Sequence, residues 1–364
     1  MRTWGLVLAV LAAVTAGVGV GGSSAQAATT WTVTTTADST GGSCLPGNCS
    51  LRQAIAAAGD GDTIMLPASS SPYVLTHGLL LVEHAITIDG GGARSTTIAG
   101  DGVNPDFSLI DLGTITIEGV TITNGIDASS AGGAGLGVDE GTVDLTDDAI
   151  VGNTENGPGS SASFGGGISV ASGATLNATR DLIAGNTVST SGTAEYAFGG
   201  GVDNNGTTTI IDSTIAGNTA SETTPSSASY GGGVATSGGT LTLENDTIVG
   251  NSATGTSGDQ AGGNLFTNSS AATQIKNTIV SGGTGALAGN CYTASGPGFS
   301  SLGGNIETTS GECGIGSGTG DKQGIDPRLG TFANHGGPTN TVALLPGPGA
   351  ARHDGLPGAR RSAR

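Results

Sequence analysis

The sequence Ile-Ala-Gly-Asn-Thr occurs at 183–187 and again at 215–219, with close copies at 150–154 (Ile-Val-Gly-Asn-Thr) and 248–252 (Ile-Val-Gly-Asn-Ser). The copies recur with a period of about 33 residues, and a nearly constant period of this length is typical of a solenoid, in which stacked repeats bury a shared core. Asn124 ends a similar phrase further upstream and is expected to start the same column. The asparagines of the four copies are Asn153, Asn186, Asn218 and Asn251.

An aromatic residue and three glycines open each repeat, as at 164–168, 198–202 and 230–234. Apolar and polar residues then alternate, as in Leu241-Thr-Leu243, and a period of two is typical of a strand and not of a helix. We therefore expect two or three short strands per repeat, followed by a polar insert such as Ser221–Ser229. One aliphatic column stands three positions before the asparagines: Ile150, Ile183, Ile215 and Ile248.

Parallel strands that pair with their copies in the next repeat form a coil of sheet whose interior backbone groups are all satisfied. Such a coil needs a column of small aliphatic side chains, which suits a chain with only 3% aromatic residues. We predict a single-stranded parallel β-helix of eight or nine coils between Tyr73 and Ile306. Right-handedness follows from the general bias of parallel crossovers.

Residues 1–27 have the pattern of a signal peptide. Arg2 precedes an apolar run from Leu6 to Val20, and Ala25-Gln26-Ala27 offers a small-residue cleavage site after Ala27. The alternative is an uncleaved membrane anchor, but the small-residue site and the polar Ser23-Ser24 favour cleavage. No later segment is apolar enough to span a bilayer. We therefore expect a secreted or cell-surface protein.

Charge and cysteine content agree with export. A net charge of −18 argues against nucleic acid as a partner, because binding a phosphate backbone needs a basic face. The four cysteines suit an oxidising compartment and allow three pairings. Pairing within each end of the chain is the simplest choice, because a solenoid keeps its ends apart. It would join Cys44 to Cys49 and Cys291 to Cys313.

A short helix is expected just before the solenoid. Ser50 is followed three positions later by Gln53, which is the spacing of a capping box, and the Ala-rich segment ends at Gly59. An apolar helix at this place would cover the core and the unpaired edge of the first coil. Residues 28–72 are therefore interpreted as an N-terminal cap.

Two motifs resemble those of a known group of proteins. The sequence Cys-Ser-Leu-Arg-Gln-Ala-Ile at 49–55 resembles the CSLREA motif of bacterial secreted β-helix proteins, with Gln53 where the motif has Glu. The segment 324–345 resembles their choice-of-anchor Q region, although Gly347-Pro-Gly replaces the usual continuation Gly-Ser-Pro. The glycine triplets are similar to repeats of polymorphic outer-membrane-type proteins.

The resemblance implies a pectin-lyase-like β-helix and a division of the chain. Repeats would fill residues 73–310, and a choice-of-anchor Q-like segment would follow at 311–346. Residues 347–364 would form a disordered tail. The tail lacks both a sortase signal and an apolar stretch, so the sequence does not predict covalent anchoring to a cell wall.

The repeated polar residues allow two interpretations. The asparagine column could line a sugar-binding groove, but stacked amides at a β-helix corner are expected to form a hydrogen-bonded ladder. The column of Asp148, Asp181 and Asp246 could bind Ca²⁺, but Ser213 interrupts it and acidic corners usually cap their own turns. The sequence therefore demands no cofactor or metal, and Ca²⁺ is the weaker alternative.

Catalytic residue types are scarce. Asp147, Asp148 and Arg180 are weak candidates, because the two aspartates are adjacent in sequence and their side chains need not converge. The leading hypothesis is a non-catalytic surface protein whose long polar face serves adhesion or contact with a glycan or protein. The alternative is a polysaccharide lyase or glycoside hydrolase, by analogy of fold alone.

Overall fold

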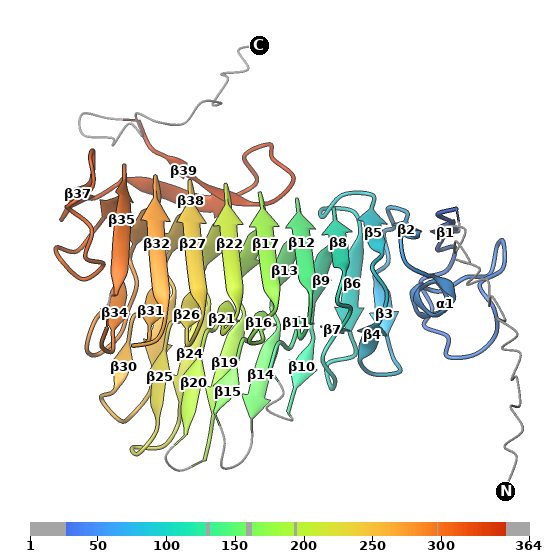
Figure 1. The fold of residues 1–364 in the computed structure, drawn as a ribbon, viewed down its shortest axis with the longest axis horizontal. Coiled ribbons are helices and arrows are strands. Elements are labelled where there is room, and N and C mark those ends of the chain that lie inside the picture. Colours follow the sequence, from blue (N-terminus) through green and yellow to red (C-terminus); the bar gives the residue numbers. More distant parts are fainter. Residues whose placement is uncertain (1–26, 129–131, 158–161, 193–194, 297, 347–364) are drawn as a thin grey trace, which may run out of the picture.

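The computed structural model describes residues 27–128, 132–157, 162–192, 195–296 and 298–346. The predicted signal peptide, apart from Ala27, and the predicted tail 347–364 lie outside the described residues. The fold is the predicted right-handed parallel β-helix, with about eight turns and one short helix (Figure 1). Among the described residues, no helix is both long and apolar enough to cross a membrane.

Three sheets enclose the core, and all neighbouring strands in them are parallel. Sheet A contains β1 (Thr30–Thr32), β2 (Thr63–Leu66), β5 (Thr87–Gly90), β8 (Thr114–Glu118), β12 (Thr142–Thr146), β17 (Thr175–Thr179), β22 (Thr207–Ile211), β27 (Thr240–Glu244), β32 (Ala272–Lys276) and β35 (Phe299–Gly303). Sheet B contains β3 (Tyr73–Leu75), β6 (Thr97–Gly100), β9 (Thr121–Thr123), β13 (Ala149–Val151), β18 (Leu182–Ala184), β23 (Thr214–Ala216), β28 (Thr247–Val249), β33 (Ile279–Ser281), β36 (Ile306–Glu307) and β37 (Lys322–Gln323). Sheet C contains β4 (Leu80–Val82), β7 (Phe107–Leu109), β11 (Leu136–Val138), β16 (Ile168–Val170), β21 (Val202–Asn204), β26 (Val234–Thr236), β31 (Leu265–Thr267) and β34 (Cys291–Thr293).

Two smaller sheets form a side lobe between sheets B and C. Sheet D contains β10 (Ile126–Asp127), β14 (Thr154–Gly157), β19 (Thr187–Thr190), β24 (Thr219–Glu222) and β29 (Ser252–Thr254). Sheet E contains β15 (Ser163–Phe164), β20 (Tyr196–Phe198), β25 (Ala228–Tyr230) and β30 (Gln260–Ala261). A central coil therefore has five strands, and the expectation of two or three was too low. The segment interpreted as a polar insert, 221–229, includes parts of β24 and β25.

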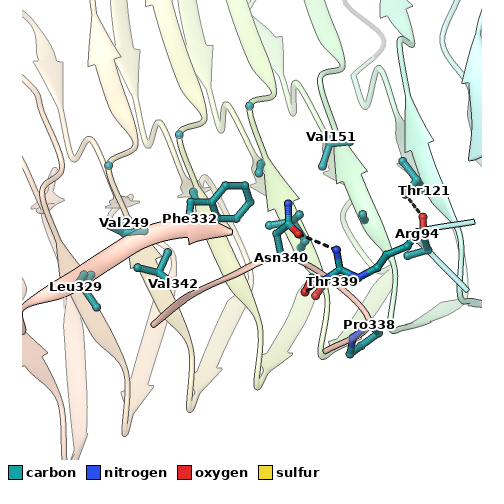
Figure 2. A pocket seen from close by; sticks show the side chains of 18 of the residues that line it. Arg94, Thr121, Val151, Val249, Leu329, Phe332, Pro338, Thr339, Asn340 and Val342 are labelled. Atoms are coloured by element: carbon teal, nitrogen blue, oxygen red, sulfur yellow. Dashed lines mark hydrogen bonds between the residues drawn. The ribbon is translucent and has the colours of Figure 1, made fainter. Parts of the chain in front are cut away.

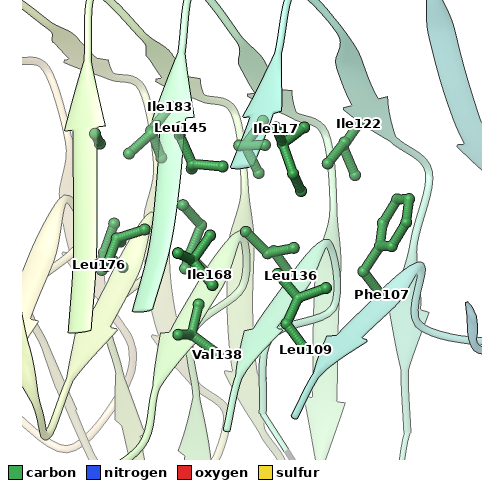
Figure 3. Close-up of a cluster of buried hydrophobic side chains, with 14 of the residues drawn as sticks. Phe107, Leu109, Ile117, Ile122, Leu136, Val138, Leu145, Ile168, Leu176 and Ile183 are labelled. Atoms are coloured by element: carbon green, nitrogen blue, oxygen red, sulfur yellow. The ribbon is translucent and has the colours of Figure 1, made fainter. Parts of the chain in front are cut away.

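The core is one continuous file of aliphatic side chains. The predicted isoleucine column pairs in register across sheet B, and all four side chains are fully buried. Figure 3 shows side chains of sheets A, B and C meeting in the same interior, among them Leu145, Ile183 and Ile168. Because each coil repeats the same small side chains at the same places, few aromatic residues are needed to fill this interior.

The N-terminal cap follows the prediction. Helix α1 (Leu51–Ala57) begins after Ser50, whose Oγ accepts the Gln53 backbone N–H, while Gln53 Oε1 accepts the Ser50 N–H. This is a complete capping box. The Cys44–Cys49 disulfide lies just before it, and Arg52 forms an ion pair with Asp38 at 2.8 Å.

The C-terminal segment folds back along the outside of the solenoid. After the Cys291–Cys313 disulfide and β37, the antiparallel strands β38 (Leu329–Ala333) and β39 (Thr341–Leu344) cross the outer face of sheet B (Figure 1). Arg94, near the start of the solenoid, donates hydrogen bonds to Gly337 O, Thr339 O and Asn340 Oδ1. We call residues 329–345 the C-terminal hairpin.

Candidate binding surfaces and polar ladders

The predicted asparagine column is a buried hydrogen-bonded ladder. Asn153 Nδ2 donates to Asn186 Oδ1, Asn186 to Asn218, and Asn218 to Asn251, at 3.1, 3.1 and 2.9 Å. Each Nδ2 also donates to a backbone carbonyl of sheet B, and each residue is fully buried. Because no amide in this ladder is accessible, it cannot form a sugar-binding groove.

The ladder extends beyond the residues that the repeat reveals. Asn251 Nδ2 donates to Asn264 Oδ1, and Asn264 Nδ2 donates to Asn290 Oδ1, both at 2.9 Å. These two asparagines come from the turn before sheet C and not from the closing phrase, so the repeat period does not show them. In the other direction, Asn124 was expected to start the ladder, and this was wrong.

Asn124 lies opposite Gly152 of the next coil and not opposite Asn153. Thr123 pairs with Val151, so Asn124 aligns with Gly152, and the N–H of Gly125 donates to Asn153 Oδ1 at 2.9 Å. Asn124 instead has a left-handed backbone (φ 63°), and its amide donates to Gly100 O. The coil from Ile122 to Ile150 is one residue shorter than the spacing between the asparagines suggests.

The aspartate column forms a second ladder at the corner between sheets A and B. The N–H of Asp148 donates to Asp181 Oδ1 at 2.7 Å, and the N–H of Asp181 donates to Ser213 Oγ at 3.0 Å. Ser213 in turn donates its N–H to Asp246. Ser213 therefore continues the ladder that it was expected to interrupt. These residues are buried and satisfy the backbone of neighbouring turns, which is the structural role expected for them.

Burial strongly perturbs several of these acids. It raises the pKa of Asp181 to about 8 and holds the pKa values of Asp148 and Asp246 well above the usual range. Asp106, just before β7, is fully buried, and neither of its carboxyl oxygens has a hydrogen-bond partner among the described residues. Burial raises the pKa of Asp106 to about 9, so this side chain is protonated at neutral pH.

Asp106→Asn is expected to stabilise the protein at pH 7 and to leave its stability nearly unchanged at pH 4. The folded-state pKa lies above the unfolded value of 3.8, so the stability linked to Asp106 is complete below about pH 4 and is lost as the pH rises toward 9. An asparagine at position 106 does not ionise, so the variant avoids this loss of stability, which is about 4 kcal/mol at pH 7. Urea unfolding at both pH values measures the difference.

Asp62→Asn is the matched control, with the opposite sign. Asp62 accepts hydrogen bonds from the Gly59 N–H, Trp31 Nε1 and the Thr29 N–H, which lower its pKa. Its contribution is present above its unfolded pKa and lost in acid, so the variant should be less stable at pH 7. Equal stability of Asp106→Asn and the unmodified protein at pH 7 would contradict the prediction.

Two of the three weak catalytic candidates contact each other, and the third lies apart. Arg180 Nε and Nη2 bind Asp147 Oδ1 and Oδ2 at 2.7 and 2.9 Å across neighbouring coils, on the outside of the corner. Asp148 points inward and is fully buried in the aspartate ladder. The two adjacent carboxylates therefore face opposite ways, and they cannot share a substrate.

One other group of described residues has metal-ligand chemistry. The ligand atoms of Asp60, His84 and Asp111, on successive turns, all lie within 4.8 Å of one another, and His84 Nδ1 is 3.0 Å from Asp60 Oδ1. The sequence did not reveal this group, because its members come from separate coils and follow no repeated phrase. Asp60 and His84 are exposed and in direct contact, and exposed acidic groups of this kind are common without a metal ion.

Five of the twelve aromatic residues form a row that the sequence analysis missed. The residue before each glycine triplet, and then two residues of sheet C, stack with ring centroids 4.6 to 6.3 Å apart. Because the rings lie face to face along the solenoid, they cover one another, and Tyr196 is the most open at 48% exposed. The row is Phe164, Phe198, Tyr230, Phe266 and Tyr292, with Tyr196 beside it.

The outer face of sheet A is a regular lattice of threonine. Strands β8, β12, β17, β22 and β27 pair without a register shift and each presents three outward side chains. Ten of these fifteen residues are threonine: Thr114, Thr116, Thr142, Thr146, Thr175, Thr179, Thr207, Thr209, Thr240 and Thr242. In Figure 1 no other described element crosses this face.

Comparison with protein-family models, curated proteins and solved structures finds no match to the chain. The similarity of residues 49–55 and 324–345 to the CSLREA and choice-of-anchor Q motifs therefore stays a prediction. Function has to be inferred from the surfaces of this chain itself.

Proposed function

We propose that this is an exported, non-catalytic β-helix protein that binds an extended neutral glycan through the outer face of sheet A. The threonine lattice is the observation that carries this proposal. Two intrachain disulfides and a predicted signal peptide suit a protein that works outside the cell. The resemblance to CSLREA and choice-of-anchor Q proteins points to the same location.

The lattice has the chemistry and the regularity of a glycan surface. Neighbouring strands lie about 4.8 Å apart, and outward residues in one strand repeat every ~6.6 Å. Each threonine offers a methyl group and a hydroxyl that both donates and accepts a hydrogen bond. A flat face of this kind can contact the C–H groups and hydroxyls of many sugar units at once, so weak single contacts add up.

The charge of the lattice and of the whole protein favours a neutral ligand over a charged one. Three of the four charged and amide side chains on the lattice have a partner: Asn177 donates to Asp144 at 2.8 Å, and Glu244 accepts from Lys276 of the neighbouring strand β32 at 2.6 Å. The protein as a whole carries a net charge of −18, which repels polyuronates and other anionic polymers. Polymers such as cellulose, chitin or xylan are therefore the expected class.

Binding to insoluble polysaccharides tests the proposal. The double variant Thr175→Glu, Thr207→Glu places two adjacent charges on the lattice, at the start of the paired strands β17 and β22. It should bind the preferred polymer at least about tenfold more weakly in a pull-down titration, because buried unpaired charge is costly. Reducing ends and unsaturated products, measured in the same samples, should stay at background.

The control is Thr187→Glu, Thr219→Glu, which makes the same change on paired strands of sheet D, away from the lattice. It should bind as well as the unmodified protein. Equal loss in both variants, or no binding to any neutral polymer, would refute the proposal. Product release would instead favour the alternative of a polysaccharide-degrading enzyme.

A further inference from the structure

A long apolar groove lies between the C-terminal hairpin and sheet B. Its volume is about 860 Å³, and its floor is formed by small outward side chains of successive strands, including Ala149, Ala184 and Ala216. An added Cβ at Gly185, Gly217 or Gly250, beside this floor, would meet no atom within 4 Å. The roof carries Leu329, Phe332 and Val342 (Figure 2).

A polar hollow of about 470 Å³ adjoins one end of the groove. The two cavities share Ala93, Arg94 and Pro338 at their boundary. The hollow is lined by the Gly90-Gly91-Gly92 turn and by three carboxylates. These carboxylates belong to Asp89, Glu118 and Asp147.

We propose that the two cavities together bind a single-chain amphiphile, with its alkyl tail in the groove and a neutral, hydroxyl-bearing head in the hollow. An apolar channel about four strand spacings long, or ~19 Å, matches an extended alkyl chain. The boundary between the cavities places the change from apolar to polar lining where the tail of such a ligand meets its head. The groove lies on sheet B, and the hollow meets the edge of the sheet A lattice at Glu118 and Thr146.

The lining of the hollow favours hydroxyl groups over a charged head. Its carboxylates accept hydrogen bonds from hydroxyl groups and repel an anion. Two arginines offset most of their attraction for a cation: Arg94 at the rim, and Arg180, which binds Asp147. Arg94 already donates to three oxygens of the hairpin, so it fixes the end of the groove. The chain's own last residues do not fit the groove, because residues 347–364 include four arginines and a single Leu.

Three detergents with chains of twelve carbons, counting the carboxyl carbon of laurate, test the choice of head group. Dodecyl maltoside, laurate and dodecyltrimethylammonium are titrated into the full chain below their micelle concentrations by calorimetry, with maltose as the head group alone. Dodecyl maltoside should bind one molecule per chain, at least about tenfold more tightly than the two charged detergents. Maltose alone should bind far more weakly, because it buries no methylene groups.

Two variants locate the binding site. Ala216→Phe fills the groove from its floor and should weaken the binding of dodecyl maltoside at least about tenfold, since the displacement of two methylene groups already has an effect of about this size. Phe332→Ala removes part of the roof without touching the core and should weaken binding about fivefold or more. Thr187→Phe, on the outer face of sheet D, adds a ring away from both the groove and the threonine lattice and should change nothing.

Binding of a charged detergent as tight as that of the maltoside would overturn the choice of head group. Unchanged affinity in both Ala216→Phe and Phe332→Ala, or no binding to the unmodified chain, would overturn the site. Circular dichroism of each variant shows whether the β-helix is intact, and Phe332→Ala keeps the test decisive if Ala216→Phe does not fold. The double variant Thr175→Glu, Thr207→Glu, which disrupts the lattice on sheet A, should bind dodecyl maltoside as tightly as the unmodified chain, so the two proposals are tested separately.

Discussion

Gly200→Ala is expected to prevent folding or to lower the free energy of unfolding by more than about 4 kcal/mol. Gly200 is the middle glycine of its triplet, at the turn from sheet E into sheet C. A Cβ at this position would lie 2.4 Å from Gly232 O and 2.5 Å from the carbonyl of Thr219, both in the next coil. These are backbone atoms, so no side chain can move aside, and the whole stack would have to separate.

Gly217→Ala is the matched control for this substitution. Gly217 has a left-handed backbone (φ 63°), but an added Cβ would meet nothing within 4 Å. The alanine should therefore cost only about 1–2 kcal/mol, the penalty for a side chain in that conformation. Thermal and urea unfolding of both variants compares the cost of the close contact at Gly200 with the cost of a side chain on the left-handed backbone at Gly217. If Gly200→Ala were as stable as Gly217→Ala, the contact between coils at the triplet would not limit the fold.

Asn218→Ala should lower the free energy of unfolding by about 4 kcal/mol, because it removes the middle of the asparagine ladder. The backbone N–H and Nδ2 of Asn186 both donate to Asn218 Oδ1, at 2.9 and 3.1 Å, and Asn218 Nδ2 donates to Ile183 O at 2.9 Å. All of these groups are buried, and each one left without a partner costs about 1–3 kcal/mol. Urea unfolding gives the difference directly.

Asn177→Ala provides the comparison. Asn177 lies on the outer face of sheet A, and its amide donates one bond, to Asp144 at 2.8 Å, where water can replace it. This variant should lose less than about 1 kcal/mol. A loss of similar size in the two variants would mean that the ladder contributes no more than an ordinary surface hydrogen bond.

The parts of this fold that repeat could be predicted from the sequence. A strand period of two and a nearly constant coil period place Ile150, Ile183 and their copies in one column, because parallel stacking carries each register into the next coil. The cap was predictable for a local reason, since Ser50 and Gln53 form their capping box within one turn of chain.

Departures from the repeat could not be predicted in the same way. Strands of sheets D and E are two to four residues long and rich in Ser, Thr and Ala, so their alternation is too weak to recognise. Asn124 was misplaced because its coil is shorter than the later ones. The aromatic row was visible as the residue before each glycine triplet, but Phe266 and Tyr292 join it from sheet C, and only the structure brings them there.

The surfaces proposed as binding sites depend even more on long-range structure. The threonine lattice follows from strand alternation, and its signal was present in Thr207-Thr-Thr209 and Thr240-Leu-Thr242. The apolar groove had no such signal. It exists because a segment near residue 335 returns to one near residue 94, and nothing in either sequence indicates the other.

This return of the C-terminal hairpin has a mechanical consequence. In a stack where each coil holds only its neighbours, the outermost coils detach first and the rest unzip one at a time. Arg94 joins the second coil to Thr339, a residue 245 positions later, so the hairpin acts as a brace parallel to the long axis. A pulling force between the two ends of the solenoid would act on this brace before it acts on the inner coils. Once the hydrogen bonds of Arg94 to the hairpin break, the coils between them would unfold together.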